Sequence, residues 1–361
     1  MPFIIVQQEL ALFVRNPSSS SEYAAGYQNI LFWLLAVLLL FAPLYRGGNR
    51  PLPLLALELG SVLLLVPVFW NLPRNTLSRH EVIALGLLVV FPLVYLIPLP
   101  GYWIQVLPGR DMYSTGMSLL DIDLSDFPAT LTLVPQATAS AWLSLLIPVA
   151  VFLGARALPA SYLLKLVTIL LGMAALQAAL GLMQFGQGAD SPLYWGMTHT
   201  HFDSGVGTYP NRNHLAGLLE MVLPIALALL VYSIGRKGRN QSSGHWRNRI
   251  VFFSTLRGHV AFGYAMLSLV LLVGLVFTRS RTGISLTILG VILVTVILSR
   301  RLGGDNVYGA TGTTIALATG IAMAIGLVPV LDRFSALDPL QDMRWVILQG
   351  LRTGLGPFSP G

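Results

Sequence analysis

Long apolar segments separated by shorter polar ones dominate the chain. Nine segments come close to the about 20 apolar residues that a helix needs to cross a bilayer. They cover residues 28–45, 52–71, 82–99, 139–157, 162–183, 214–234, 259–277, 282–299 and 312–330. Only a helix satisfies all its backbone groups within one segment in lipid. The pattern therefore predicts an all-α, polytopic membrane bundle over residues 28–330. Residues 1–27 precede this bundle, and residues 331–361 follow it.

Composition agrees with this prediction. Hydrophobic residues make up 55% of the chain, charged residues only 10%, and the mean hydropathy is +0.72. The formal net charge is +7. A nucleic-acid-binding protein is also basic, but it would not place its charges between long apolar segments, so no nucleic acid is expected as a partner. The absence of cysteine excludes disulfides, thiolate metal sites and a cysteine nucleophile.

The basic loops predict the orientation of the bundle. The segment 235–258 carries the strongest cluster of basic side chains, so it should face the cytoplasm. If each successive span crosses the membrane once from that loop, the N-terminus lies inside. Three polar stretches, 101–138, 187–213 and 331–361, then lie outside. The predicted location is therefore a membrane that the chain crosses several times, with these three stretches on its outer face.

Nine arginines fall on the outer face, against the positive-inside tendency. They are Arg46, Arg50, Arg110, Arg212, Arg279, Arg281, Arg333, Arg344 and Arg352. Clustered arginines suit phosphate, which a guanidinium can bind through two parallel hydrogen bonds. The sixth and eighth segments both start at this face, and helix N-termini attract anions. The competing interpretations are helix capping by the asparagines beside Arg212, and arginines that snorkel to the interface.

Two motifs carry a resemblance to a known family. The run GTYPNRNHLAGLLEMVLPIALALL at 207–230, followed by FTRSRTG at 277–283, resembles the O-antigen ligase and O-antigen polymerase superfamily of bacterial envelopes. The segments 41–59 and 107–110 are similar to one ligase-related branch. The resemblance implies a GT-C type glycosyltransferase fold with 11–12 helices, of which about nine are present here. The chain is then expected to stop short of the last helices.

The resemblance also implies an activity. Such proteins transfer a glycan from an undecaprenyl diphosphate carrier to lipid A–core, another glycan or a protein, among membrane lipids and without a metal or other cofactor. Arg212 and Arg281 are expected to bind the diphosphate, with Arg279 less certain. The expected supporting residues are Asn211, Asn213, His214 and Glu220. Glu220 lies inside an apolar segment, where a carboxylate usually has a function.

The catalytic base is the weakest part of this interpretation. In the family it is a histidine in a large periplasmic loop, after a segment that resembles residues 344–361, so its expected position lies beyond Gly361. The 361-residue form is therefore expected to bind carrier without transferring glycan. His199 and His201 are the only candidates in the outer loops, and their spacing is more typical of an exposed polar turn.

Two other functions remain open: an exopolysaccharide polymerase, and a transporter or flippase for lipid-linked glycan. Broken helices and an inverted repeat would favour a transporter, and the sequence displays neither. Gln177 and Gln184 lie seven residues apart in the fifth segment and therefore share one helix face. They are expected to form hydrogen bonds between helices.

Overall fold

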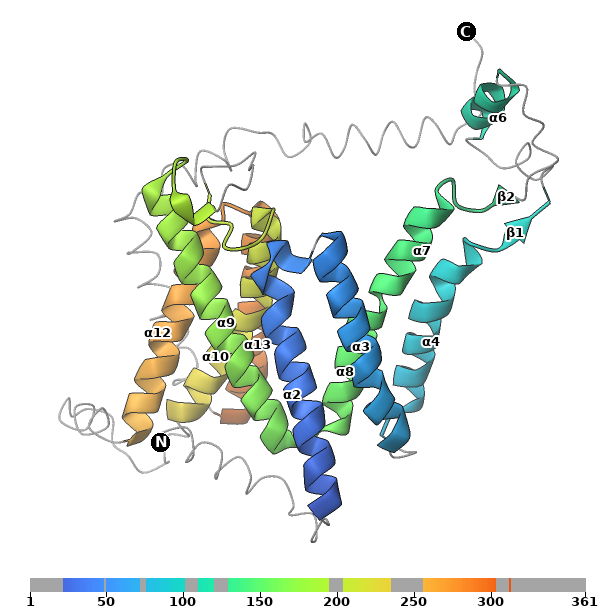
Figure 1. The fold of residues 1–361 in the computed structure, drawn as a ribbon. Coiled ribbons are helices and arrows are strands. Elements are labelled where there is room, and N and C mark those ends of the chain that lie inside the picture. Colours follow the sequence, from blue (N-terminus) through green and yellow to red (C-terminus); the bar gives the residue numbers. More distant parts are fainter. Residues whose placement is uncertain are drawn as a thin grey trace.

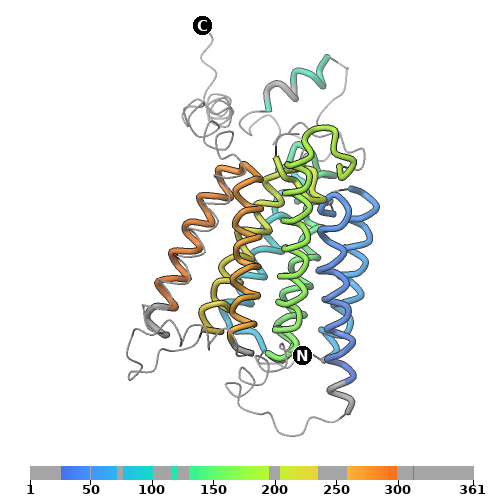
Figure 2. The backbone as a smooth tube through the Cα atoms, turned by 90° about the vertical axis from the view of Figure 1, so that its left-hand side faces the viewer, coloured from blue at the N-terminus to red at the C-terminus, as the bar shows by residue number. Residues whose placement is uncertain are grey.

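The computed structural model describes residues 22–48, 50–71, 76–100, 110–119, 129–194, 204–234 and 256–302, together with residue 312. Long helices lie side by side in a bundle (Figures 1 and 2). Seven of the described helical segments are long and apolar enough to cross a membrane: Gly26–Leu44, Pro51–Trp70, Pro135–Ala157, Ala160–Gln187, Arg212–Ile234, Gly258–Phe277 and Arg281–Leu298. The described chain is thus an all-α, multi-pass membrane protein, as predicted.

The elements follow one another up and down the bundle (Figure 1). In order they are α2 (Glu22–Leu44), η1 (Arg46–Gly48), α3 (Pro51–Asn71), α4 (Arg79–Val94), β1 (Pro98–Leu99), α6 (Asp111–Ser118), β2 (Ala129–Thr130), α7 (Pro135–Ser144), α8 (Leu146–Ala157), α9 (Ala160–Gln187), η3 (Pro192–Tyr194), α10 (Arg212–Ile234), α12 (Leu256–Phe277) and α13 (Arg281–Leu302).

Two large apolar clusters and a third, small one hold the described helices together. The first lies where α10 packs against α9, α12 and α13, the second joins α2, α3, α8 and the first half of α9, and the small one contains Val273 and Phe277 of α12. Small residues bring the helices of the first cluster close. A Cβ added to Gly274 of α12 would lie 2.7 Å from the Cβ of Ala178 in α9. Small residues at such crossings let helix backbones approach in a membrane, where van der Waals packing drives association. Because α10 packs against each of the other three helices of this cluster, it is the central helix of this half.

The predicted span at 82–99 needs correction. The helix there, α4, ends at Val94 and has 16 residues, which gives a length of about 24 Å. That is less than the about 30 Å of a hydrocarbon core. Proline disfavours a helical conformation in the residue before it, and Pro98 instead pairs with Thr130 in a short antiparallel ladder. Apart from residue 312, the predicted span 312–330 lies outside the described residues, so the described chain supports seven of the nine predicted spans.

The predicted span at 139–157 consists of two helices. α7 and α8 meet at Leu145, whose N–H donates back to the carbonyl of Trp142 at 3.1 Å. Pro148 has no N–H, so it cannot bond the carbonyl of Ser144 as a helix requires. The break follows from that missing hydrogen bond, and the two pieces together remain long enough to span.

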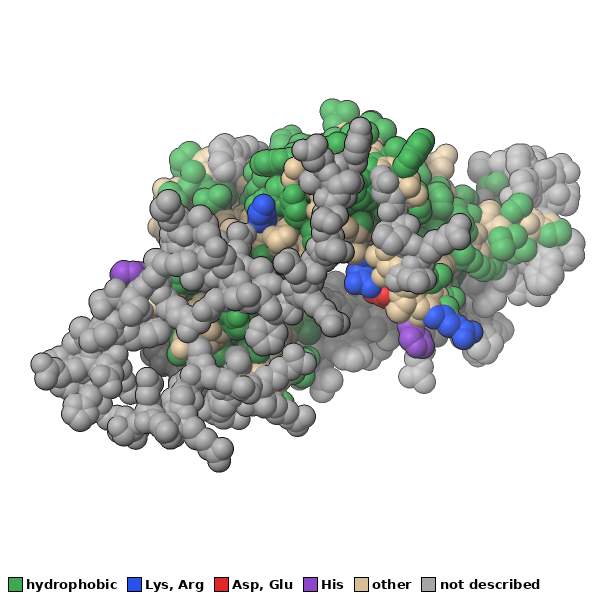
Figure 3. Space-filling model, turned by 90° about the horizontal axis from the view of Figure 1, so that it is seen from below, with side chains coloured by type: hydrophobic (Ala, Val, Ile, Leu, Met, Phe, Trp, Pro, Cys, Tyr) green, Lys and Arg blue, Asp and Glu red, His purple; other side chains and the backbone are tan. Residues whose placement is uncertain are grey.

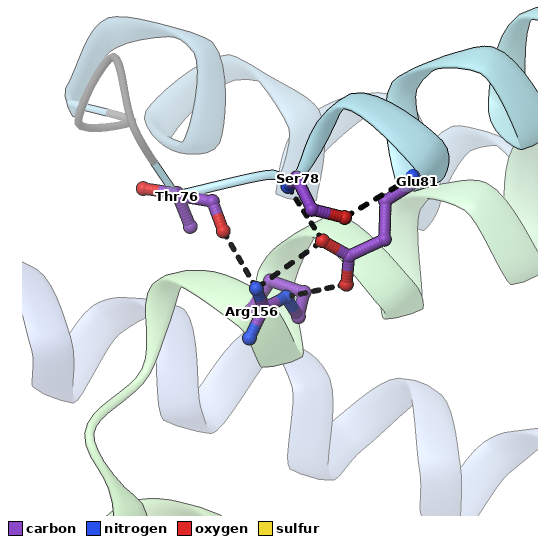
Figure 4. Close-up of polar contacts among 4 residues, drawn as sticks. All are labelled: Thr76, Ser78, Glu81 and Arg156. Carbon is purple, nitrogen blue, oxygen red and sulfur yellow. Dashed lines mark hydrogen bonds and ion pairs between the residues drawn. The ribbon is translucent and has the colours of Figure 1, made fainter.

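At the lower end of the bundle, one polar network joins α4 to α8 (Figure 4). Arg156, in the last turn of α8, contacts Glu81 with 3.1 Å between Nε and Oε1, and its Nη2 donates to the carbonyl of Thr76 at 2.7 Å. Ser78 and Glu81 form a capping box at the start of α4. The backbone N–H of Ser78, then its side chain and Arg156, lower the pKa of the Glu81 carboxyl. Seen from below, the charged side chains that are visible among the described residues lie between hydrophobic ones (Figure 3).

The arrangement of the helices predicts on which side of the membrane an exposed residue lies. His80 is exposed at the start of α4, and Asp190 is exposed just after α9, at the opposite end. Because the chain has no native cysteine, single-cysteine variants His80→Cys and Asp190→Cys can be labelled cleanly. In intact spheroplasts, a membrane-impermeant maleimide should label only Asp190→Cys. Labelling of His80→Cys, or of both variants, would contradict the orientation.

Candidate functional site

Two helix N-termini meet at the upper end of the bundle. α10 begins at Arg212 and α13 at Arg281. The hydroxyl of Ser280, just before α13, donates to the side-chain oxygen of Asn213 in the first turn of α10, at 2.8 Å. This hydrogen bond joins residues that are direct neighbours of arginines in the sequence. The two helix starts are therefore held together.

Side-chain oxygens cap both helices. The side-chain oxygen of Asn211 accepts the N–H of Asn213 at 2.9 Å, which confirms the capping role expected of an asparagine at this position. Ser280 caps α13 by accepting the N–H of Gly283 at 3.2 Å, a role that the sequence analysis missed. Each of these caps accepts one backbone N–H of its helix start, while a helix start has four N–H groups without partners inside the helix. Both helix starts therefore stay suited to an anion.

The structure brings the three predicted arginines to one place. Arg212 directly precedes Asn213, while Arg279 and Arg281 flank Ser280, so all three adjoin the hydrogen bond between the two helix starts. Arg212 is buried, with 4% of its surface exposed, and Arg279 and Arg281 are half-buried. Three positively charged residues at one partly buried end of the bundle favour a negatively charged partner there, because screening by water is weak in such surroundings.

The predicted supporting residues differ in their positions. A Cβ added to Gly283 would lie 2.6 Å from the Cβ of Ala216 and 3.4 Å from Oε2 of Glu220. Gly283 therefore lets α13 approach α10 closely, and the Glu220 carboxylate lies against the first turn of α13. His214 is exposed, and its ring stacks on that of Tyr209, with 6.5 Å between centroids.

The predicted catalytic base has no counterpart among the described residues. The candidates His199 and His201 lie outside the part of the chain that the structure describes. Gly361, beyond which the resemblance places the family's histidine, also lies outside it. The assignment of a base therefore stays a prediction.

Gln184 holds the loop that leads into α10. This side chain of α9 is fully buried. Its oxygen accepts the N–H groups of Val206 at 3.2 Å and Gly207 at 2.8 Å. Its amide nitrogen donates to the carbonyls of Gly207 at 2.8 Å and Leu193 at 3.1 Å. One amide thus bonds four backbone groups, three of them in the buried Val206–Gly207 segment.

Gln177, two turns earlier on the same face, holds the next residue of the loop. Its oxygen accepts the N–H of Thr208 at 3.0 Å, and its amide nitrogen donates to the Thr208 hydroxyl at 2.9 Å. That hydroxyl donates in turn to the carbonyl of Pro43 in α2. The prediction of a shared polar face is confirmed. Outside α9, however, the partners of the two glutamines are residues 206–208 of the loop and Leu193 of η3, and not residues of another long helix as expected.

Backbone contacts complete the support of this loop. The N–H of Gly205 donates at 2.9 Å to the carbonyl of Phe277, the last residue of α12. A Cβ on Gly205 would lie 2.7 Å from the carbonyl oxygen of Gly181 in α9. Gly207 has a φ of 61° and lies against the Gln177 side chain. Glycine is required at these positions, because a side chain would meet backbone or strain the turn.

Arg110, another of the arginines predicted to face outward, has a different role. It is buried, and its Nη2 donates to the carbonyls of Thr130 at 2.9 Å and Leu131 at 2.6 Å. Its partners are therefore backbone carbonyls of the last residue of β2 and of the residue that follows it. These bonds use one nitrogen of the guanidinium, and a phosphate partner for this arginine stays a prediction. Arg333, Arg344 and Arg352 lie outside the described residues.

No family model, curated protein or solved structure matches this chain in comparisons with known proteins. Within the described ranges, no group of three or more His, Asp or Glu side chains is placed to hold a metal ion. The chemistry of the site therefore has to be inferred from its arginines, its helix ends and the loop between them.

The buried amide of Gln184 predicts a large loss of stability on substitution. Gln184→Leu has a similar size but leaves four backbone groups unpaired in the interior. We expect the free energy of unfolding to fall by about 2–4 kcal/mol, measured by denaturation in detergent. Met183→Leu is the matched control, because Met183 is the adjacent residue and 54% exposed. Equal losses in both variants would contradict the role of Gln184.

Tyr209 predicts a change of stability at alkaline pH. Burial raises the pKa of its phenol from 10.0 to about 12, so the folded protein favours the neutral form. This contribution to stability is complete below about pH 10 and is lost as pH rises toward about 12. Tyr209→Phe should therefore show a smaller fall in melting temperature than the wild type between about pH 9.5 and 11.5. Parallel curves for the two proteins would show that Tyr209 titrates normally.

Proposed function

We propose that this protein binds the diphosphate of a lipid-linked glycan at Arg212, Arg279 and Arg281 and transfers the glycan to an acceptor. The observation that carries the proposal is the hydrogen bond between Ser280 and Asn213, which holds two arginine-bearing helix starts together at one end of an apolar bundle. A diphosphate has enough oxygens for several guanidinium groups, and arginine binds them better than lysine does.

The lipid part of such a substrate also has a surface available. Below Arg281, α13 exposes a row of apolar side chains, including Ile288, Leu289, Ile292 and Leu293. A polyprenyl chain in the bilayer can lie along this face while its diphosphate reaches the arginines at the end of the same helix. A soluble phosphate compound would gain nothing from this arrangement, so it favours a lipid-linked anion.

The proposed reaction needs no metal. The acceptor hydroxyl forms a bond with the anomeric carbon of the glycan and gives its proton to a base. The bond from that carbon to the diphosphate oxygen breaks, and its electron pair stays with the diphosphate. Fixed arginines and helix N-termini stabilise the charge that develops there. The resemblance to the O-antigen ligase and polymerase superfamily supports an undecaprenyl carrier, a periplasmic active face in the inner membrane, and lipid A–core, glycan or protein as acceptor.

A binding measurement on the purified protein in nanodiscs tests the proposal. Arg281→Lys keeps the charge but loses the planar fork, and we expect the affinity for polyprenyl diphosphate to fall about tenfold or more. Arg212→Lys should behave in the same way. The control is Arg79→Lys, an exposed arginine at the other end of the bundle. Equal affinity in all these proteins would remove the case for a diphosphate site.

Transfer and transport are separated by a second measurement. In proteoliposomes that contain a fluorescent glycosyl polyprenyl diphosphate, a transferase releases free polyprenyl diphosphate when acceptor is present. A flippase instead moves intact donor between leaflets, which a membrane-impermeant quencher detects. Arginine-dependent translocation without release would replace the transferase proposal by the transporter alternative.

A further inference from the structure

The turn between α2 and α3 is docked on the loop that leads to Arg212. Pro43, at the end of α2, accepts the hydrogen bond of Thr208. Gly47 lies under the ring of Tyr209, and a Cβ at Gly47 would come within 2.5 Å of a ring carbon. The ring of Tyr209 in turn stacks on that of His214. Arg46, which precedes Gly47, is thereby brought to the same end of the bundle as Arg212.

Arg46 has an uncommon backbone conformation. Its φ is 51°, and among the described residues only Arg279, at 56°, is another non-glycine residue with positive φ. Both arginines lie in turns that contact the 204–214 segment, one through Gly47 and one through Ser280. A left-handed conformation is unfavourable for a residue with a Cβ, and glycine adopts it freely. Strained residues of this kind gather at functional sites, where the surrounding structure holds them.

The Arg46 side chain is also available for a ligand. It is half-buried, and no hydrogen bond or ion pair joins its guanidinium to another residue of the described chain. Structural arginines at both ends of the same bundle do have such partners: Arg110 bonds backbone carbonyls, and Arg156 bonds Glu81. Arg46 thus combines an unfavourable backbone with a guanidinium that the described protein does not use.

We propose that Arg46 is a further ligand of the diphosphate and acts mainly on the leaving group; this inference rests on the proposed function. When the bond to the anomeric carbon breaks, the diphosphate changes from a diester to a monoester and gains one negative charge. A cation from a third turn, separate from those that carry Arg212 and Arg281, complements that additional charge. Arg46 therefore binds free polyprenyl diphosphate more strongly than the glycosylated donor, which favours the transition state over the bound substrate.

The test uses Arg46→Gly, which removes the guanidinium and relieves the backbone. Binding to the full chain in nanodiscs is measured with polyprenyl diphosphate and with a glycosyl polyprenyl diphosphate, and the melting temperature is recorded. We expect affinity for the free diphosphate to fall about ten- to hundredfold, affinity for the glycosylated lipid to fall much less, and the melting temperature to stay the same or rise. A purely structural arginine would give a lower melting temperature instead.

Arg50→Ala is the matched control, because Arg50 is exposed in the same connection. It should bind both lipids like the wild type. Unchanged affinities in Arg46→Gly, an equal loss for both lipids, or a lower melting temperature would each overturn the role of Arg46. If Arg281→Lys still weakens binding in those cases, the proposed function stands. If Arg281→Lys and Arg212→Lys are also without effect, the proposed function itself is wrong.

Discussion

The arrangement of the upper end depends on one constraint: the polar backbone of residues 204–211 has to be satisfied next to an apolar bundle. An unpaired backbone group is costly there, because neither lipid nor apolar side chains offer a partner. Gln184 and Gln177 of α9 supply the missing donors and acceptors from one helix face. The C-terminal carbonyl of α12 supplies another acceptor. With those bonds made, the loop has a defined path, and α10 starts at a defined place.

That defined path is what makes the arginines useful together. An arginine on a mobile loop would have to be ordered each time it bound an anion, which lowers affinity. Here Arg212 follows a loop fixed to α9, and Ser280 fixes the start of α13 to Asn213. The two helix starts that carry the proposed site are therefore fixed by the protein itself, which is the condition under which charged groups stabilise a developing charge well.

The sequence predicted seven of the nine proposed spans and the common end of the bundle for Arg212, Arg279 and Arg281, because both follow from local pattern: apolar length, the alternation of successive spans and the Asn-Arg-Asn start of α10. It also showed that Gln177 and Gln184 share a face. It could not show their partners, since a glutamine bonds a loop or a helix equally well and the choice depends on tertiary packing. The same holds for Arg110, whose bonds to Thr130 and Leu131 join residues about 20 positions apart. Ser280 was missed because a single serine in a turn has no distinctive pattern.

The two strained arginines connect the supporting loop to the proposed chemistry. A non-glycine residue keeps a left-handed conformation only where its surroundings determine the backbone more strongly than its own preference does. For Arg46 those surroundings are Thr208 and Tyr209, and for Arg279 they are the hydrogen bonds made by Phe277 and Ser280 with the 204–214 segment. One segment, held by the glutamines of α9, therefore supports both turns. Loosening it should disturb arginines on both sides of Arg212 at once, so the glutamines position the site although they need not touch a ligand.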